Sequence, residues 1–424
     1  MKPVKILLLS PFFYPEAIST GKYNTALAEA LVRAGAEVRV IASHPFYPGW
    51  KPVYSDATLD LVFVTRGGSW VRYPSSMILR RLVFEIWYTF HVLWTIWRRP
   101  TKVDIVVAVF PPSLFFCLAP LILPSTARKV GIVHDFQGAL GLTGGGVLKR
   151  QLQRVVRTIE RKSFRSCQTL VALSNAMARR AVKEYGASRE RLVVAYPFVS
   201  LKPTSTPKAN LVHLFPDTFH HVVYSGALGK KQNPFELLKF FQTAALRFPN
   251  VRFHICSEGP IFDEICKINV AHPVDGLICH GLVAEADLEE LYARSTVQVI
   301  PQAPRSEDAC LPSKLPNILA AGCAILGICE SDSELANILR QCSAGLVSSW
   351  ETEVLVVRLE KVLELVKVQS RDRRRALAGP LLAAQFTLDS LVDAVLDRSK
   401  KKVVEAATRA VRLESTTTAA AETS

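Results

Sequence analysis

Short apolar runs alternate with helical patterns along most of this chain. Helical patterns at Tyr23–Ala34 and Ala176–Tyr185 each end before a glycine, which is a common helix stop. This alternation predicts an α/β protein in which helices cover parallel sheets. The runs of buried-strand type are Lys5–Ser10, Glu37–Ser43, Leu61–Thr65, Asp104–Phe110, Lys129–Asp135, Thr169–Leu173 and Arg191–Tyr196, and then His221–Ser225, Val251–Cys256, Leu277–His280, Val297–Pro301, Ala324–Ile328 and Gly345–Val347.

The second set of strands begins after residues 202–210, a Pro/Ser/Thr-rich segment without periodicity. We interpret this segment as a linker between two doubly wound domains, one over residues 1–201 and one over 211–402. A chain of 424 residues is long enough for two such cores. Residues 403–424, rich in Ala, Thr and Ser, are predicted to be a disordered tail. Further helices are predicted at Phe235–Arg247, Ala286–Arg294, Lys314–Ala321, Ser333–Arg340 and from Glu351 to Lys402.

The net charge of +15 comes entirely from the first half of the chain. Residues 1–200 hold 27 Lys and Arg against 11 Asp and Glu, whereas the rest of the chain is close to neutral. Such a basic half suits nucleic acid, anionic lipid or phosphorylated ligands. No zinc-finger spacing or aromatic RNA-binding strand pair is present, so nucleic acid is not an expected partner. Phosphorylated ligands and anionic lipid remain.

Nine cysteines, an odd number without any Cys-x-x-Cys pair, predict reduced thiols in a cytoplasmic protein. They argue against a disulfide framework and against a cysteine metal site. The apolar core of the N-terminus, Ile6–Leu9, is too short for a signal peptide. No uninterrupted apolar run reaches 18 residues, so no membrane-spanning helix is expected.

Two motifs in the second half point to a bound anion. Gly226 and Gly229 follow a predicted strand and would allow close backbone approach, while Lys231 adds a positive charge suited to a diphosphate. Ser313 and Lys314 open a short helix, where Ser313 is predicted to be the N-cap. Each motif alone is more often an ordinary capped helix. Both in one domain favour a nucleotide-diphosphate site.

Two features of the first half are candidates for the other ligand. Gly21 follows the first strand, and the loop Ser19–Thr20–Gly21 would bring backbone amides to a phosphate or sugar; a plain βα turn is the alternative. His134 and Asp135 stand at the end of the fifth predicted strand, where ligands bind in doubly wound sheets. A structural hydrogen-bonding role for His134 is the competing interpretation. We take His134 and Asp135 as the catalytic candidates.

An aromatic stripe between Arg80 and Arg99 has basic residues at both ends. This composition suits peripheral contact with an anionic membrane on its cytoplasmic face, and a helix packed against its own sheet is the alternative. The aromatic residues are Phe84, Trp87, Tyr88, Phe90, Trp94 and Trp97, and the basic ones are Arg80, Arg81, Arg98 and Arg99.

Six strings follow one another from Ser10 to Gly322: SPFFYPEAISTGKYNTALAEALVRAGAEVRVIASHPFYPGW, VHDFQ, YSGALGKKQN, SEGP, HGLV with DLEELYARSTVQVIPQ, and PSKLPNILAAG. As a set they resemble the GT-B-fold glycosyltransferases of family 4, and most closely the subgroup that builds colanic acid and related bacterial exopolysaccharides. The resemblance implies two Rossmann-like domains, an N-terminal one for the acceptor and a C-terminal one for a nucleotide-sugar donor. It implies transfer with retention of anomeric configuration, and neither a metal nor another cofactor.

By position, the resemblance gives His134 the place of the histidine near the transferred sugar and Lys231 that of the lysine at the donor phosphates. Gly21 matches the N-terminal glycine loop, usually a Gly pair, and Gly259 matches the glycine of the SEGP turn.

The sequence departs from the family where many members carry two glutamates, because Ala309 and Asn317 occupy those positions here. Glu307 and Asp308 lie nearby but out of register. We keep Asn317 as a donor-binding candidate. The departure leaves two alternatives to a hexosyltransferase acting on a lipid-linked or glycan acceptor: a degenerate binding or scaffold protein, and a nucleotide-sugar 2-epimerase.

Overall fold

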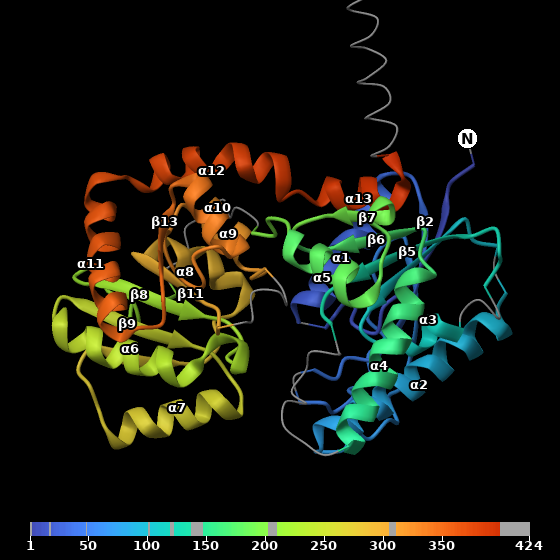
Figure 1. Ribbon diagram of the computed structural model, residues 1–424, viewed down its shortest axis with the longest axis horizontal. Coiled ribbons are helices and arrows are strands. Elements are labelled where there is room, and N and C mark those ends of the chain that lie inside the picture. Colours follow the sequence, from blue (N-terminus) through green and yellow to red (C-terminus); the bar gives the residue numbers. More distant parts are fainter. Residues whose placement is uncertain are drawn as a thin grey trace, which may run out of the picture. The chain divides into compact units, whose positions relative to one another are not determined.

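The structure is a computed structural model that describes residues 2–16, 18–47, 49–100, 102–118, 123–136, 147–201, 210–304 and 311–398, without the side chains of 147–149. The chain forms two compact units (Figure 1). Unit 1 takes Met1–Leu173, Ala178–Ala195 and the chain from Leu388 onward, and unit 2 takes Ser174–Met177 and Tyr196–Thr387. Nearly all of the predicted linker and the whole predicted tail lie outside the described residues.

Unit 1 is built on a seven-stranded parallel sheet in the order β3-β2-β1-β4-β5-β6-β7. The central strand β4 is buried along its whole length, as expected for a strand covered on both faces. The strands are β1 (Lys5–Leu9), β2 (Glu37–Ser43), β3 (Val62–Gly67), β4 (Ile105–Phe110), β5 (Arg128–Val133), β6 (Thr169–Ala172) and β7 (Leu192–Val194).

The helices of unit 1 form two packed groups around this sheet. Helix α1 packs against α13 in one group, and α2, α3 and α4 pack in succession in the other. A short 3-10 helix, η3 (Arg189–Arg191), precedes β7. The α-helices are α1 (Ser19–Arg33), α2 (Met77–Arg98), α3 (Leu114–Leu118), α4 (Val147–Arg165), α5 (Asn175–Tyr185) and α13 (Leu388–Leu396).

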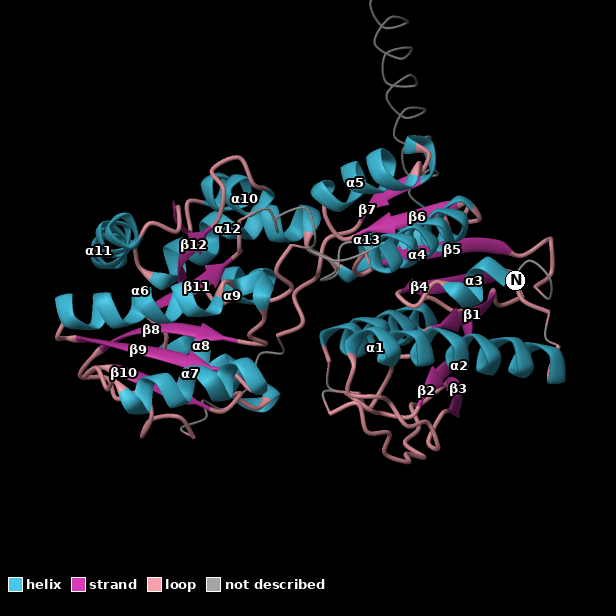
Figure 2. Ribbon diagram, turned by 60° about the horizontal axis from the view of Figure 1, so that its bottom comes forward, coloured by secondary structure: helices cyan, strands magenta, loops and turns pink. Residues whose placement is uncertain are grey.

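Unit 2 has a six-stranded parallel sheet in the order β10-β9-β8-β11-β12-β13, again with helices on both faces (Figure 2). All thirteen strands of the two sheets coincide with runs expected from the sequence, within a few residues at each end. The strands are β8 (His220–Ser225), β9 (Val251–Cys256), β10 (Leu277–His280), β11 (Val297–Pro301), β12 (Ala324–Ile328) and β13 (Gly345–Ser348).

Side chains of α6, α7 and α11 share one core with alternate residues of β8 and β9, such as Tyr224 and Phe253. Leu291 of α8 packs with Val223 and Cys256 on the other face. The elements are η4 (Lys230–Gln232), α6 (Pro234–Arg247), α7 (Pro260–Ala271), η5 (Glu285–Asp287), α8 (Leu288–Arg294), α9 (Leu315–Ala320), α10 (Glu334–Cys342), α11 (Thr352–Val368) and α12 (Arg371–Gln385).

The domain boundaries predicted from the sequence need correction at the C-terminal end. Helix α13 belongs to unit 1 and not to the second domain, although it follows unit 2 in the chain. Arg128 on β5 donates hydrogen bonds to the carbonyl oxygens of Val395 and Ala394, and it pairs with Asp397 at 3.6 Å. Apolar residues of α13 also complete the unit 1 core. Helical periodicity identifies such a helix but not the sheet on which it packs.

One stretch in the described residues, Arg371–Leu396, is long and apolar enough to span a membrane by length and composition alone. In the structure it is not a single helix. Helix α12 ends at Gln385 and α13 begins at Leu388, and the two helices pack in different units.

Candidate active site

The carboxyl edge of the unit 2 sheet carries the glycine turn predicted from the sequence. Gly226 follows β8 directly, and its amide donates a 3.0 Å hydrogen bond to the carbonyl oxygen of Cys256 at the end of β9. Its φ is +137°, a backbone conformation that residues with a side chain rarely adopt. The turn therefore depends on glycine and leaves a bare backbone surface at the strand ends.

Lys314 reaches this turn from a distant part of the sequence. It immediately precedes α9, and its Nζ donates a 3.0 Å hydrogen bond to the carbonyl oxygen of Ser225. The amine also lies 4.1 Å from the centroid of the Tyr224 ring, and a Cβ at Gly226 would be 3.9 Å from it. Burial lowers the pKa of Lys314 to about 7. The structure thus unites two motifs that lie almost 90 residues apart.

Gly229 and Lys231 frame a second turn of the same loop. The Gly229 amide donates to Oε1 of Gln232 at 3.0 Å, and the Lys231 carbonyl oxygen accepts from Ala303 N at 2.8 Å. This second bond ties the lysine backbone to the segment that follows β11. Asn233, in the left-handed region with φ +48°, then leads into α6. Lys231 is therefore held at the carboxyl edge, as the diphosphate role requires.

Gly259 is the N-cap of α7 and has a φ of +99°, so its turn also requires glycine. Two residues earlier, Ser257 is fully buried, and in the described residues its hydroxyl has no hydrogen-bond partner. The same holds for Oε1 of Gln302, which follows β11. Ser257 and Gln302 belong to two of the family-like strings, but neither was singled out as a site residue, because single polar residues after strands are common.

Ser313 does not cap α9, contrary to the prediction. Lys314 is the N-cap residue, the helix has no side-chain cap, and Ser313 is exposed. The carbonyl oxygen of Pro312 accepts the hydrogen bond of the Leu315 amide at 3.0 Å, so the chain enters the helix through a turn that begins at proline. A donor-binding role for Ser313 stays a prediction.

Asn317 is buried and its side-chain amide is engaged. Its Oδ1 accepts hydrogen bonds from the amides of Ser200 and Leu201, and its Nδ2 donates to Oγ of Ser200. Asn317 therefore holds the segment that leaves unit 1, and its donor-binding role stays a prediction. Glu307, Asp308 and Ala309 lie outside the described residues.

His134 follows β5 at the carboxyl edge of the unit 1 sheet. Its amide donates to the carbonyl oxygen of Phe110 at 2.9 Å, and its ring meets Tyr23 of α1 edge-on at 4.8 Å between centroids. Its Nε2 is buried and has no hydrogen-bond partner in the part of the chain that the structure describes. Burial lowers the pKa of His134 to about 3, so the ring is neutral at physiological pH.

Asp135 lies beside a buried basic group. Its Oδ1 accepts the Phe136 amide at 2.9 Å. Burial lowers the pKa of Arg81 on α2, and the opposing charges of Asp135, Glu160 and Glu85 partly restore it. Arg81 is therefore a partly buried neighbour of the candidate site.

Ser19, Thr20 and Gly21 form the first turn of α1, which begins four residues before the predicted helix start. Gly21 is thus helical rather than part of a loop. A Cβ there would lie 2.7 Å from the carbonyl oxygen of Glu16, so glycine is needed for close packing. Tyr23, two residues later, contacts His134, and this brings the helix start and the histidine together.

Glu16 was not predicted from the sequence, yet it organises the loop after β2. It is 5% exposed, and its carboxylate accepts hydrogen bonds from the amides of Phe46 and Tyr47 at 3.0 and 3.1 Å. Burial raises the pKa of this carboxyl, although the two amides oppose the shift.

Helix α2 exposes one apolar face and buries the other. Phe84, Trp87 and Tyr88 are buried, with Trp87 Nε1 donating to the Tyr73 hydroxyl at 2.6 Å. The exposed apolar side chains, which we call the α2 stripe, recur at helical spacing: Leu79, Leu82, Ile86, Phe90, Trp94 and Trp97. The predicted aromatic stripe is therefore divided between core and surface.

The basic residues near α2 are divided in the same way. Arg80 stacks on Trp50 at 4.5 Å, whereas Arg98 and Arg99 are exposed. Helix α4 adds an exposed basic face made of Arg150, Arg154, Arg157, Arg161 and Arg165.

Three histidines form a hydrogen-bonded chain across unit 2. Nδ1 of His221 is 2.9 Å from Nε2 of His254, whose Nδ1 is 2.9 Å from Nε2 of His280. Nε2 of His221 lies 2.8 Å from the carbonyl oxygen of Pro216 and must donate to it. In the neutral state, each ring therefore carries its proton on Nε2.

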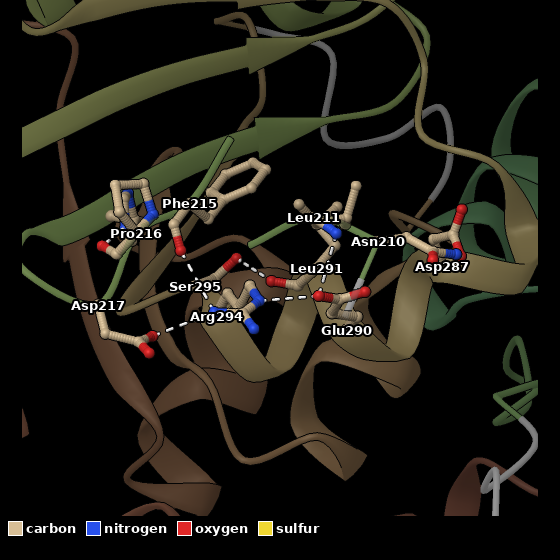
Figure 3. A network of polar contacts seen from close by, with 11 residues as sticks. Asn210, Leu211, Phe215, Pro216, Asp217, Asp287, Glu290, Leu291, Arg294 and Ser295 are labelled. Carbon is tan, nitrogen blue, oxygen red and sulfur yellow. Dashed lines mark hydrogen bonds and ion pairs between the residues drawn. The ribbon is translucent and has the colours of Figure 1, made fainter. Parts of the chain in front are cut away.

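Next to the histidine chain, a polar network holds the segment 210–217 that leads into β8 (Figure 3). Arg294 donates to Glu290, Asp217 and the carbonyl oxygen of Phe215. Glu290 also accepts the Leu211 amide at 3.1 Å. Because Phe215 and Pro216 are adjacent, Arg294 and His221 anchor the same turn.

Residues 20–202 match the model of Glycosyltransferase Family 4. The putative colanic acid biosynthesis glycosyl transferase WcaI of Escherichia coli (strain K12) is 25% identical over 394 residues, covering 88% of this chain and 95% of that protein. This match confirms the predicted resemblance to the colanic acid subgroup.

Solved structures share the fold at low identity. WaaG, a glycosyltransferase involved in lipopolysaccharide biosynthesis, aligns with a TM-score of 0.64 at 16% identity, covering 92% of this chain and 99% of that one. The catalytic domain of starch synthase IV from Arabidopsis thaliana, bound to ADP and acarbose, aligns with a TM-score of 0.65 at 14% identity, covering 94% and 99%. These likenesses confirm the predicted architecture of two Rossmann-like units.

Proposed function

Because this chain is a family 4-like glycosyltransferase with the GT-B fold, we propose that it moves a sugar from a nucleotide-diphosphate sugar to a lipid-linked or glycan acceptor. The colanic acid and lipopolysaccharide relatives support a place in surface-polysaccharide biosynthesis. The ADP complex of a structural neighbour supports a nucleotide-linked donor.

The observation that carries this proposal is the meeting of Lys314 with the Gly226 turn at the carboxyl edge of unit 2. Doubly wound sheets bind nucleotides at this edge. A bare glycine backbone admits a phosphate, and the amine supplies positive charge. Lys231, on η4 of the same loop, adds a second positive charge. Together these groups would stabilise the diphosphate as it leaves, without a metal ion or another cofactor.

In unit 1, His134 has the properties of a neutral hydrogen-bonding group. A pKa of about 3 makes it a weak base at neutral pH. Its buried Nε2 has a hydrogen-bonding position to offer, so it suits contact with a hydroxyl of the transferred sugar. Asp135 is the next residue in the chain, and Tyr23 of α1 contacts the His134 ring. The family resemblance supports a retaining outcome as part of this proposal.

The test is incubation of the full chain with a panel of nucleotide sugars and lipid-linked or glycan acceptors. Transfer predicts nucleoside diphosphate and glycosylated acceptor in equal amounts.

His134→Ala should lower kcat while nucleotide affinity stays within twofold, and His213→Ala, an exposed histidine of unit 2, serves as the matched control. Isomerised donor would instead identify a 2-epimerase. Nucleotide binding without turnover on any acceptor would identify a binding module.

We further propose that the α2 stripe and the basic face of α4 hold the enzyme against an anionic membrane surface, as a peripheral protein of the cytoplasmic face. Exposed aromatic residues at helical spacing suit the bilayer interface, and exposed arginines suit its negative charge. This placement would put unit 1 near a lipid-linked acceptor.

A further inference from the structure

The side chain of Lys314 is partly buried, and its amine is poorly compensated. In the described residues its hydrogen bond goes to a single neutral acceptor, the carbonyl oxygen of Ser225 at 3.0 Å. On another side it faces the Tyr224 ring, with Nζ 4.1 Å from the centroid. An ammonium offers three donors, so a carbonyl and a ring leave part of its capacity unused.

The titratable groups around this amine do not supply a counter-charge. The Cys256 thiol on β9 faces it, and burial raises the pKa of that thiol to about 12, so it is neutral. Burial also raises the pKa of Tyr224, whose hydroxyl donates to the carbonyl oxygen of Ala227. An enclosed cation without an anion is unfavourable, which is why the pKa of Lys314 falls to about 7.

The side of the amine towards Gly226 is where an anion would enter. A Cβ at Gly226 would stand 3.9 Å from Nζ, and the glycine leaves that position open. The φ of +137° keeps larger residues from occupying the turn. A phosphate oxygen resting over the Gly226 backbone would therefore be within reach of the amine.

We propose that Lys314 is a proton-coupled anion site, which takes up one proton from solvent when the diphosphate of the donor binds beside Gly226. This inference rests on the proposed function and deepens it. The step is the addition of H⁺ to the neutral amine, giving an ammonium that pairs with the phosphate; no other bond forms or breaks. The empty site thus avoids an uncompensated charge, and the loaded site is electrostatically matched.

Linkage makes the consequence measurable. Well above pH 7, nucleotide binding should take up close to one proton, and affinity should fall by about tenfold per pH unit. Below pH 6 Lys314 already carries its proton, so proton uptake by this residue should disappear; the terminal phosphate of the nucleotide titrates in that range, so the tenfold slope is measured above pH 7.

The experiment is isothermal titration calorimetry of the full chain with UDP, GDP and ADP at pH 8.5, in buffers of different ionisation enthalpy. At this pH the free nucleotide phosphates are fully ionised, so proton uptake reports on the protein. We expect uptake of close to one proton for the wild type. Lys314→Arg should bind the same nucleotide with uptake below about 0.2 proton, because arginine is charged at every accessible pH. Lys230→Met, an exposed neighbour, should match the wild type.

The outcomes separate this inference from the proposed function. A nucleotide that binds the wild type without proton uptake overturns the role of Lys314 and leaves sugar transfer intact. Proton uptake that persists in Lys314→Arg assigns the proton to another group. This result also overturns the role of Lys314 and leaves sugar transfer intact. Binding of none of the nucleotides removes both. Proton uptake by the wild type can be measured without any variant, so a variant that folds poorly does not invalidate the test. Circular dichroism checks that each variant is folded.

Discussion

Lys231 and Lys314 approach the carboxyl edge of unit 2 from different elements and differ in their surroundings. Both side chains are partly buried, but the amine of Lys314 is committed to the Ser225 carbonyl oxygen, whereas Lys231 is on a short 3-10 helix whose backbone is bonded to Ala303. A charge in such a position interacts with phosphate while it remains partly hydrated. The two lysines should therefore contribute to donor binding in different ways.

Replacement of Lys231 by alanine should weaken nucleotide binding by about 1.5–3 kcal/mol, the scale of a charge-assisted hydrogen bond. Calorimetry at pH 7 measures this loss, and Lys230→Ala is the matched control on the same 3-10 helix. Equal affinity of wild type and a folded Lys231→Ala variant would take Lys231 out of the site.

Some residues of the site could be predicted from sequence because their chemistry follows a pattern. Glycines and lysines in the turn after a strand predicted Gly226 and Lys231, and the start of a helix predicted Lys314; the structure brings Lys314 to the Gly226 turn, and their roles in donor binding stay predictions. Asn317 and Glu16 show where such patterns fail. The partners of Asn317 lie 116 and 117 residues away in the chain, and the loop amides held by Glu16 lie about 30 residues away. Contacts of that kind depend on tertiary structure.

At the level of elements, strands were easier to predict than helices. Fully buried parallel strands are continuous apolar runs, and such a run can be recognised in the sequence without any alternation of apolar and polar residues. Helix α4 was not predicted because its exposed face is rich in arginine, which dilutes the apolar pattern. Helix α7 was also not predicted. It begins at Pro260, directly after the Gly259 turn, and a Gly-Pro pair is typical of a turn.

The α2 stripe leads to a prediction about membrane contact. Phe90→Asp with Trp97→Asp should reduce sedimentation with vesicles of 30% anionic lipid at least fivefold, because each change removes an exposed aromatic side chain and adds repulsion. High salt should release the wild type as well. Trp94, 44% exposed, should shift its emission to the blue when vesicles are added.

A matched control comes from an exposed residue of unit 2. Leu246→Asp also replaces a surface apolar side chain, 78% exposed, but outside the proposed membrane surface. It should sediment like the wild type. Unchanged sedimentation of the α2 double variant would show that the stripe does not contact lipid.

At the scale of the whole molecule, the proposed mechanism uses lysines and backbone amides, and not a metal ion, to stabilise the leaving diphosphate. We therefore expect activity to persist when a chelator is added. The chain has no Asp-x-Asp sequence of the kind that holds a divalent ion. Turnover in excess EDTA should stay within about twofold of the untreated rate. Loss of turnover that magnesium or manganese restores would contradict the lysine mechanism.

The histidine chain of unit 2 predicts acid sensitivity. Burial, together with the charges of His221, His280 and Arg252, lowers the pKa of His254 from its ordinary 6.5 to about 2. Below pH 6.5 the unfolded chain binds a proton that the folded chain does not, so the free energy of unfolding decreases as pH falls. Each such histidine contributes about 1.4 kcal/mol per pH unit in that range, and nothing above it.

Urea unfolding followed between pH 7.5 and 5 measures this effect. The midpoint should fall steadily below pH 6.5, and His254→Leu should flatten the dependence. His272→Ala, which changes an exposed histidine away from the three rings, should run parallel to the wild type. A wild-type midpoint that does not change over this range would mean that the three rings accept protons without loss of structure.

Helix α13 has a consequence for how the protein is made. The sheet of unit 1 is complete once β7 has been synthesised. Arg128, however, has its hydrogen-bond partners on α13, which begins almost 200 residues after β7 ends. During translation, unit 1 must therefore leave the ribosome with an uncovered patch while the whole of unit 2 is still emerging. Helix α13 therefore packs on unit 1 only after unit 2 has been synthesised. If a ribosome stalls within unit 2, the incomplete unit 1 would be a target for chaperones and proteases.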